Sequence, residues 1–146
     1  MSQENVEIVR RWYALLSQDD YEAFFDESPL EGVFDFSRRL IDPVVLRGRD
    51  EMRAWMERER QMWEGDHVGY EPKELIDAGD EVLALVRVSG RGKASGVEVE
   101  AYTWNVATFR DGKPVELTYF GDDQAAAFQA AGLSKQDAHA DLKPSE

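Results

Sequence analysis

The sequence predicts a single α+β domain in which one antiparallel sheet packs against three to four helices. Helical periodicity is confined to residues 3–25, 49–63 and 124–131, whereas most strand-forming segments follow residue 68. Helices and strands that are segregated along the chain are typical of α+β domains rather than of doubly wound sheets. The chain has 146 residues, the usual size of one domain, so it can bury a substantial core without cross-links.

The first helix is expected at residues 3–17, where apolar side chains recur every three or four positions and form one face. These side chains are Val6, Val9, Trp12, Tyr13 and Leu16. A polar break at residues 18–20 separates this helix from a short one at residues 21–25. The clearest helix covers residues 49–63, and its apolar stripe consists of Met52, Trp55, Met56 and Trp63.

The strands carry the β-branched and aromatic residues. They are expected at residues 33–36, 44–46, 68–76, 81–88, 97–110 and 115–120. Turn residues separate the last four, most clearly Asp111 and Gly112, a pair that favours a tight hairpin. These four strands are therefore expected to pair in antiparallel order. A short helix at residues 124–131 follows them, and residues 134–146 form a polar tail.

Charge and composition exclude several classes of partner. The formal net charge of −13 disfavours phosphate backbones and anionic membranes, so we expect no nucleic acid and no membrane partner. The absence of cysteine and of an N-terminal apolar segment points to a cytoplasmic protein without disulfides. His67 and His139 are the only histidines and belong to no recognisable ligand set, so we expect no metal and no cofactor.

Four segments carry a resemblance to a known family. They are ENVEIVRRWYALLSQDD, VLRGRDEMRAWM, ELIDAGDEVLALVRVSGRG with GVEVEAY, and TFRDGKPVELTYF. Their order resembles the nuclear transport factor 2-like superfamily, which includes ketosteroid isomerase and the SnoaL-like polyketide cyclases. The resemblance implies one SnoaL-like domain over residues 1–133. It also implies a cone-shaped, curved antiparallel sheet that encloses a pocket with its helices, and pairing of two chains through the convex face.

Alternation along residues 97–110 separates two faces of the sheet. Glu98 and Glu100 are expected to face water, because burying unpaired carboxylates is expensive. The opposite positions would line the interior; they are Val97, Val99, Ala101, Thr103, Asn105, Ala107 and Phe109.

The outer face would then carry an exposed aromatic patch of Tyr102, Trp104 and Val106. The resemblance makes this patch a homodimer interface. The alternative is a bulge that turns these side chains inward.

Asp35 is the candidate general base. Alternation places Val33 and Asp35 on one side of their strand, and Phe34 and Phe36 on the other. An aspartate on the buried side would be desolvated and its pKa raised, as a general base requires. The segment VFDF also resembles the isomerase segment that bears the proton-shuttling aspartate. In the alternative, Asp35 accepts a hydrogen bond from the backbone of the following loop.

Asn105 and Tyr119 complete the candidate catalytic set. Asn105 lies near the place of a second acid in the isomerases, and its amide could polarise a carbonyl group; the alternative is a satisfied polar residue in the sheet. Tyr119 stands where the cyclases carry a catalytic acid, and Trp12 where the isomerases carry an oxyanion tyrosine. Both catalytic patterns are therefore incomplete in this chain.

The expected pocket wall is apolar and suits a flat ligand. It consists of Trp12, Tyr13, Met52, Trp55, Met56, Thr103, Phe109 and Leu117. For Trp12, Met52, Trp55, Met56 and Phe109 the alternative is a place in the core. Arg38 and Arg39 either lie at the pocket mouth or are solvated loop charges.

Three functions are compatible with these residues. The first is an enzyme of the isomerase or lyase type that moves a proton on an apolar carbonyl compound. The second is a module that binds a small apolar molecule, or dimerises, without chemistry. The third is a structural dimer whose cavity is filled by its own side chains.

Overall fold

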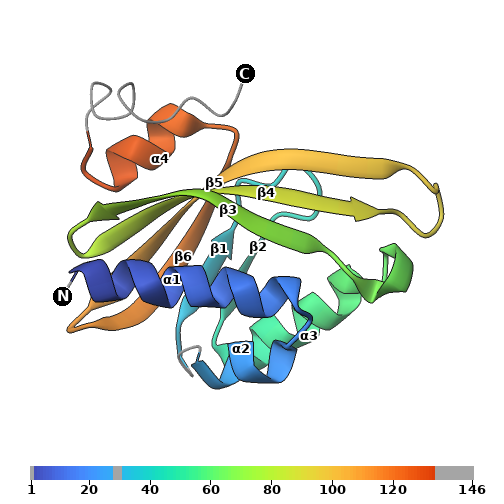
Figure 1. Cartoon of the computed structure of the whole chain (residues 1–146), viewed down its shortest axis with the longest axis horizontal. Helices are drawn as coiled ribbons and strands as arrows, with labels where there is room; N and C mark the ends of the chain where they lie inside the picture. Colours follow the sequence, from blue (N-terminus) through green and yellow to red (C-terminus); the bar gives the residue numbers. More distant parts are fainter. Residues whose placement is uncertain (1, 28–30, 134–146) are drawn as a thin grey trace.

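The computed structural model describes residues 2–27 and 31–133 and has the predicted order of helices and strands (Figure 1). The elements are α1 (Ser2–Ser17), α2 (Tyr21–Glu27), β1 (Val33–Phe36), β2 (Val44–Arg47), α3 (Arg49–Arg60), the short 3-10 helix η1 (Glu64–Asp66), β3 (Gly69–Ala78), β4 (Glu81–Arg91), β5 (Glu98–Arg110), β6 (Lys113–Gly121) and α4 (Gln124–Ala130). The predicted polar tail at residues 134–146 lies outside the described residues.

In the described residues the strands form one six-stranded sheet in the order β2-β1-β6-β5-β4-β3. All neighbouring pairs are antiparallel except β1 and β6, which run parallel. The β5–β6 hairpin turns at Asp111 and Gly112, whose φ values of 55° and 76° are those that a tight two-residue hairpin turn requires. The predicted α+β class is confirmed.

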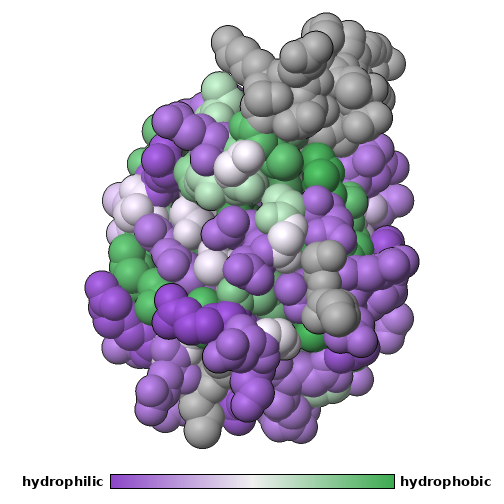
Figure 2. Space-filling model, turned by 90° about the vertical axis from the view of Figure 1, so that its left-hand side faces the viewer, coloured by the Kyte–Doolittle hydropathy of each residue, from purple (hydrophilic) through white to green (hydrophobic). Residues whose placement is uncertain are grey.

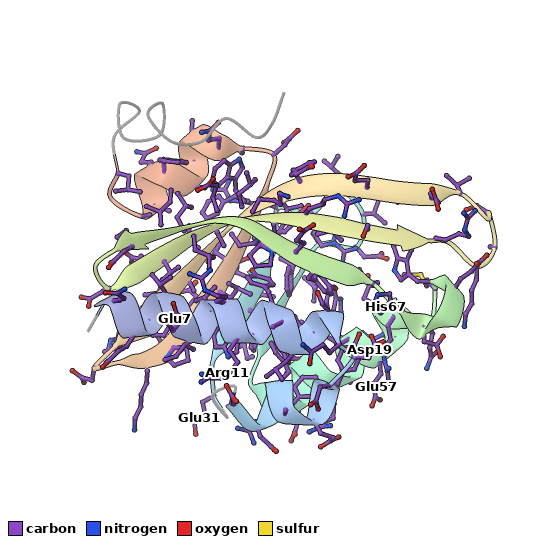
Figure 3. All side chains as sticks on the ribbon, in the orientation of Figure 1. Glu7, Arg11, Asp19, Glu31, Glu57 and His67 are labelled. Carbon is purple, nitrogen blue, oxygen red and sulfur yellow. The ribbon has the colours of Figure 1, made fainter. Side chains whose placement is uncertain are left out.

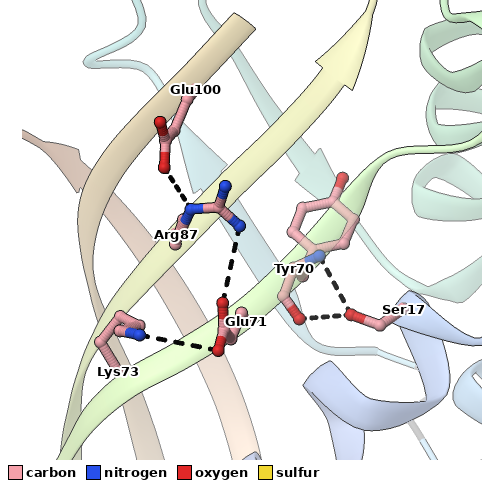
Figure 4. Close-up of polar contacts among 6 residues, drawn as sticks. All are labelled: Ser17, Tyr70, Glu71, Lys73, Arg87 and Glu100. Atoms are coloured by element: carbon pink, nitrogen blue, oxygen red, sulfur yellow. Dashed lines mark hydrogen bonds and ion pairs between the residues drawn. The ribbon is translucent and has the colours of Figure 1, made fainter.

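The sheet curves over α1, α2 and α3, which lie on its concave side, whereas α4 lies on the convex side (Figure 1). α1 runs along β3, and the Ser17 hydroxyl links the two elements. This hydroxyl donates to the Tyr70 carbonyl oxygen and accepts the Tyr70 N–H at 3.0 Å (Figure 4). The concave side therefore holds the main core and any enclosed site.

The helix α3 ends at Arg60, earlier than the residue 63 expected from the apolar stripe. Trp63 already has an extended backbone and forms an isolated bridge with Gly92, the residue directly after β4. Its ring lies against Gly90, where a Cβ atom would come within 2.9 Å of it. Pairing and packing with the sheet thus replace the last turn of the predicted helix.

The convex face carries a second core beneath α4. Phe128 of α4 packs edge-on against Trp104, with ring centroids 5.2 Å apart. Trp104 and Val106 are each only 3% exposed, so the prediction that they form an exposed patch is wrong. The alternation that put them on the outer face is correct, but Gly121, with a φ of 63°, lets the chain turn so that α4 covers that face.

The charged residues of the convex face form a row of ion pairs farther along the sheet (Figure 4). Arg87 of β4 lies between Glu100 of β5 and Glu71 of β3, and Lys73 also approaches Glu71. Glu100 thus faces water, as alternation predicts. At the end of the molecule formed by the β3–β4 and β5–β6 turns, most of the surface is hydrophilic, with hydrophobic residues gathered toward the top of the view (Figure 2).

Candidate ligand-binding site

The inward-facing residues of β5 change from buried to exposed along the strand. Phe109, Ala107 and Asn105 are 3%, 1% and 6% exposed. Thr103 is half-buried, and Val99, near the start of the strand, is 41% exposed. One end of the concave face is thus filled by the core, whereas the other end is accessible.

We call the filled part the closed end, defined by Val9, Trp12, Phe24, Val82 and Phe109. The Trp12 ring stacks on Phe109 at 6.5 Å between centroids and meets Phe24 edge-on at 6.2 Å. Met52 and Met56 are also buried in this core cluster. Five of the expected wall residues (Trp12, Tyr13, Met52, Met56 and Phe109) therefore belong to the hydrophobic core, which was the alternative given above for all of them except Tyr13.

Trp12 keeps one unusual feature inside the closed end. Its indole Nε1 is buried and has no hydrogen-bond partner among the described residues. A buried donor without a partner costs about 1–3 kcal/mol. The aromatic packing of Trp12 therefore outweighs the cost of its unpaired N–H.

We call the region where the row changes from buried to accessible the open end, defined by the side chains of Phe36, Arg39, Trp55, Glu59, Tyr70, Thr103, Asn105 and Tyr119. Phe36, the last residue of β1, stacks on Trp55 of α3 with centroids 4.8 Å apart and an interplanar angle of 11°. Tyr119 of β6 lies 6.1 Å from the same Phe36 ring. Trp55 and Tyr119 are half-buried, so these rings offer apolar surface to a ligand.

Asn105 and Tyr119 lie opposite each other in the β5–β6 pairing, so two of the three catalytic candidates share the open end. The Asn105 Nδ2 atom donates to the Thr103 Oγ1 atom at 3.2 Å. This contact matches the satisfied polar residue given above as the alternative for Asn105. A catalytic role for either residue stays a prediction.

Asp35 does not face the concave side. Phe34 and Phe36 of the same short strand pack into the concave core, so alternation points Asp35 to the opposite face. Its Oδ1 atom accepts hydrogen bonds from the Ser37 N–H at 2.9 Å and the Ser37 hydroxyl at 2.6 Å. The expectation that Asp35 lies on the buried side is wrong, and its contacts are those of the alternative, a cap for the following loop.

Of the two arginines after β1, only Arg39 reaches the open end. Arg38 places its guanidinium over Phe120, 4.6 Å from the ring centroid, and Phe120 belongs to the convex core. The Arg39 guanidinium lies 5.2 Å from the Trp55 ring centroid. Its Nη2 atom pairs with the Glu59 Oε1 atom at 3.3 Å.

The apolar pattern of the sequence does not identify Glu59 as part of the site. Its side chain is only 22% exposed, because the loop after β1 brings Arg39 over it. The signal that could have identified it is its spacing: Glu59 follows Trp55 by four residues, so both lie on one face of α3.

Two tyrosines bring neutral hydroxyl groups to the interior between α1 and β3. Burial raises the pKa of Tyr13 above the usual range, and the Tyr70 phenol adds to this effect. Burial also raises the pKa of Tyr70, with further increases from Tyr21 and Glu59, whereas Arg39 lowers it. Both hydroxyls therefore stay protonated near neutral pH and can donate hydrogen bonds.

No group of three or more histidine, aspartate or glutamate side chains in the described residues could hold a metal ion. His67 pairs instead with Asp19, with Nδ1 2.9 Å from Oδ1 (Figure 3). Among the helices of residues 2–27 and 31–133, none has the length and apolar character needed to cross a bilayer.

A separate surface depression of about 420 Å³ lies where β1 and β6 begin and β5 ends. It is lined by Glu31, Gly32, Arg110, Val115 and Glu116. Three of these five residues are charged, and none belongs to the open end. The depression is therefore a second candidate binding site for a small molecule.

Comparison with known proteins agrees with this fold. A model of the SnoaL-like domain family matches residues 9–117. Bal32a, from a soil-derived mobile gene cassette, is 18% identical with a TM-score of 0.73, and the match covers 84% of this chain and 92% of that one. No curated protein sequence matches the chain closely enough to add to this comparison.

Two other solved structures contain small molecules. A protein with a ketosteroid isomerase-like fold from Catenulispora acidiphila, in complex with trimethylamine, is 18% identical with a TM-score of 0.68, and 89% of this chain and 95% of that one are covered. TerC, co-crystallised with polyporic acid, is 18% identical with a TM-score of 0.70, and 88% of this chain and 97% of that one are covered. At these identities the comparison establishes the fold alone.

Proposed function

Because the chain belongs to the SnoaL-like domain family, we propose that it binds a small, flat and largely apolar molecule at the open end of its concave face. The observation that carries this proposal is the change along β5, where inward-facing residues pass from 1% exposed at Ala107 to 41% at Val99. At this transition the Phe36 ring lies beside the half-buried rings of Trp55 and Tyr119. Tyr119 pairs with Asn105, whose amide donates to the Thr103 hydroxyl. Apolar walls with a few converging polar groups are typical of small-molecule sites.

Two solved structures of this fold with small molecules support a small-molecule ligand in general. Trimethylamine and polyporic acid were found with proteins of this fold. The fold alone does not assign a function, so the argument for this chain depends on its own open end.

Binding without chemistry is the function we favour. Proton transfer needs a base beside the ligand, and Asp35 caps Ser37 on the other face of the sheet instead. Asn105 and Tyr119 could polarise a carbonyl group but neither supplies a base at neutral pH. The isomerase or lyase hypothesis therefore loses its proposed base, and the carboxylate that does lie at the open end, Glu59, is paired with Arg39.

A neutral naphthalene dye whose emission depends on solvent polarity, such as prodan, tests the proposal. We expect a blue shift on binding to the wild-type protein. Thr103→Trp fills the open end from inside and should abolish the shift. Tyr102→Trp adds a similar ring one residue away on the convex face and should leave the shift unchanged, so it is the matched control.

Two results would contradict the proposal. One is the absence of any shift with the wild-type protein at millimolar concentrations of protein and saturating dye. The other is equal binding to the Thr103→Trp and Tyr102→Trp variants, which would place the dye elsewhere.

Self-association through the convex face stays a separate prediction. α4 covers Trp104 and Val106, which leaves the half-buried Tyr102 and the ion-pair row around Arg87 as accessible parts of that face. Size-exclusion chromatography with light scattering measures the mass directly. A wild-type dimer that dissociates in the Tyr102→Asp variant would support the prediction. A wild-type monomer at all concentrations would contradict it.

A further inference from the structure

We propose that Arg39 binds an anionic oxygen of this ligand, a carboxylate or an ionised ring hydroxyl, while the ligand's ring system packs against Trp55. This inference rests on the proposed function and names the chemical class of the ligand. It concerns a residue that neither catalytic pattern of the family resemblance includes.

Arg39 has an unused hydrogen-bond donor. Its Nη1 atom is buried and has no hydrogen-bond partner among the described residues, whereas Nη2 pairs with Glu59. A guanidinium offers donors along more than one edge and binds carboxylates with two parallel hydrogen bonds. A buried donor is expensive to leave unpaired, so an acceptor supplied by a ligand would remove a cost that the free protein bears.

Arg39 is also held in place before any ligand arrives. Its backbone N–H donates to the Phe36 carbonyl oxygen at 3.1 Å. Its guanidinium lies over the Trp55 ring and pairs with Glu59, and its side chain is only 23% exposed. A binding group that is already ordered loses little conformational entropy when it binds.

The surroundings of Arg39 suit an aromatic anion. Trp55 stacks on Phe36, which gives a flat apolar surface directly beside the guanidinium. Tyr70 lies close to both members of the ion pair: the charge of Glu59 raises the pKa of the Tyr70 hydroxyl, and the charge of Arg39 lowers it. Burial nevertheless keeps this hydroxyl protonated, so it can act as a second donor to an anionic oxygen.

The net charge of the protein opposes this ligand at long range. With −13 charges the chain repels anions in solution, so the attraction must come from direct contact at Arg39. At about 0.15 M salt the Debye length is about 8 Å, which screens the distant carboxylates far more than a contact at hydrogen-bond distance. The binding experiment is therefore best done at this ionic strength.

Two probes with the same ring separate the anion from the apolar surface. They are 2-naphthoate and 2-naphthamide, which differ in charge but hardly in size. Arg39→Met and Arg38→Met are matched variants, since each removes one positive charge from adjacent positions and only Arg39 faces the open end.

We expect the wild-type protein to bind both probes in isothermal titration calorimetry. Arg39→Met should raise the Kd of 2-naphthoate at least about tenfold, as the loss of a charge-assisted pair implies. Its effect on 2-naphthamide should be less than about twofold, and Arg38→Met should change neither Kd by more than that. If Arg39→Met fails to fold by circular dichroism, Arg39→Gln removes the charge while keeping a donor and takes its place.

The outcomes distinguish this inference from the proposed function. Equal weakening of both probes by Arg39→Met would overturn the anion contact but leave ligand binding at the open end intact. Binding of 2-naphthamide without 2-naphthoate would do the same. Failure of both probes to bind the wild-type protein would overturn the proposed function and this inference together.

Discussion

Both ends of the concave face include inward-facing residues of β5, but one end is hydrophobic core and the other is the proposed binding site. At the closed end, the inward side chain of Phe109 is covered by Trp12 of α1, which in turn meets Phe24 of α2. At the open end, Thr103 of the same inward row is half-buried and Ala101 is exposed. Alternation is identical along the strand, so the elements that cover it decide which residues become core and which become site.

This difference predicts the largest stability effect at the closed end. Phe109→Ala should lower the free energy of unfolding by about 3–5 kcal/mol, because it opens a cavity beneath Trp12. Val99→Ala, on the same face but 41% exposed, should cost less than about 1 kcal/mol. Urea denaturation followed by fluorescence measures both, and similar costs at the two positions would contradict the contrast.

Alkaline pH should weaken the fold through the two tyrosines between α1 and β3. Burial raises the pKa of Tyr13 and Tyr70 in the folded state above the value in the unfolded chain. The unfolded chain therefore loses these protons first, so their contribution is complete below pH about 10 and is lost as the pH rises further. In this window, deprotonation of each tyrosine should lower the free energy of unfolding by up to about 1.4 kcal/mol per pH unit.

Urea unfolding at pH 9 and pH 11 tests this sign. Tyr13→Phe and Tyr70→Phe should each make the free energy of unfolding less dependent on pH between these values. An unchanged pH dependence in both variants would show that the hydroxyls are not desolvated.

Trp55→Ala should affect binding more than stability. Trp55 is half-buried and stacks on Phe36, so its loss should cost about 1–2 kcal/mol, less than full burial of an aromatic ring would imply. The same variant should abolish the emission shift of prodan. Retained dye binding would mean that the ligand does not pack at the open end.

Asp35→Asn should have the smallest effect. Replacing the carboxylate weakens the hydrogen bonds from Ser37 and should cost about 0.5–1 kcal/mol. Because Asp35 faces away from the concave side, the affinity for prodan should not change. Loss of dye binding in a folded Asp35→Asn protein would show that Asp35 belongs to the binding site.

The sequence allowed the local pattern to be predicted, but not what packs over it. Alternation correctly put Asn105 and Phe109 on the inner face and Trp104 on the outer face. It could not show that α4 folds back over Trp104, because that depends on the turn at Gly121 and on packing between distant segments.

The same limit explains the errors at the site. Periodicity placed Asp35 and Phe36 on opposite faces of the strand but could not show which face is buried. In the structure, the two phenylalanines of that strand pack into the core. Glu59 was not identified because its partner Arg39 comes from a loop whose course no periodicity describes.

A chemical-shift map of the protein's backbone amides during titration with 2-naphthamide tests the central claim most directly. If the open end is the binding site, the largest shifts should fall at Phe36, Trp55, Thr103, Asn105 and Tyr119. If the largest shifts fall at Glu31, Arg110 and Glu116, the molecule occupies the outer depression instead, and the claim is contradicted.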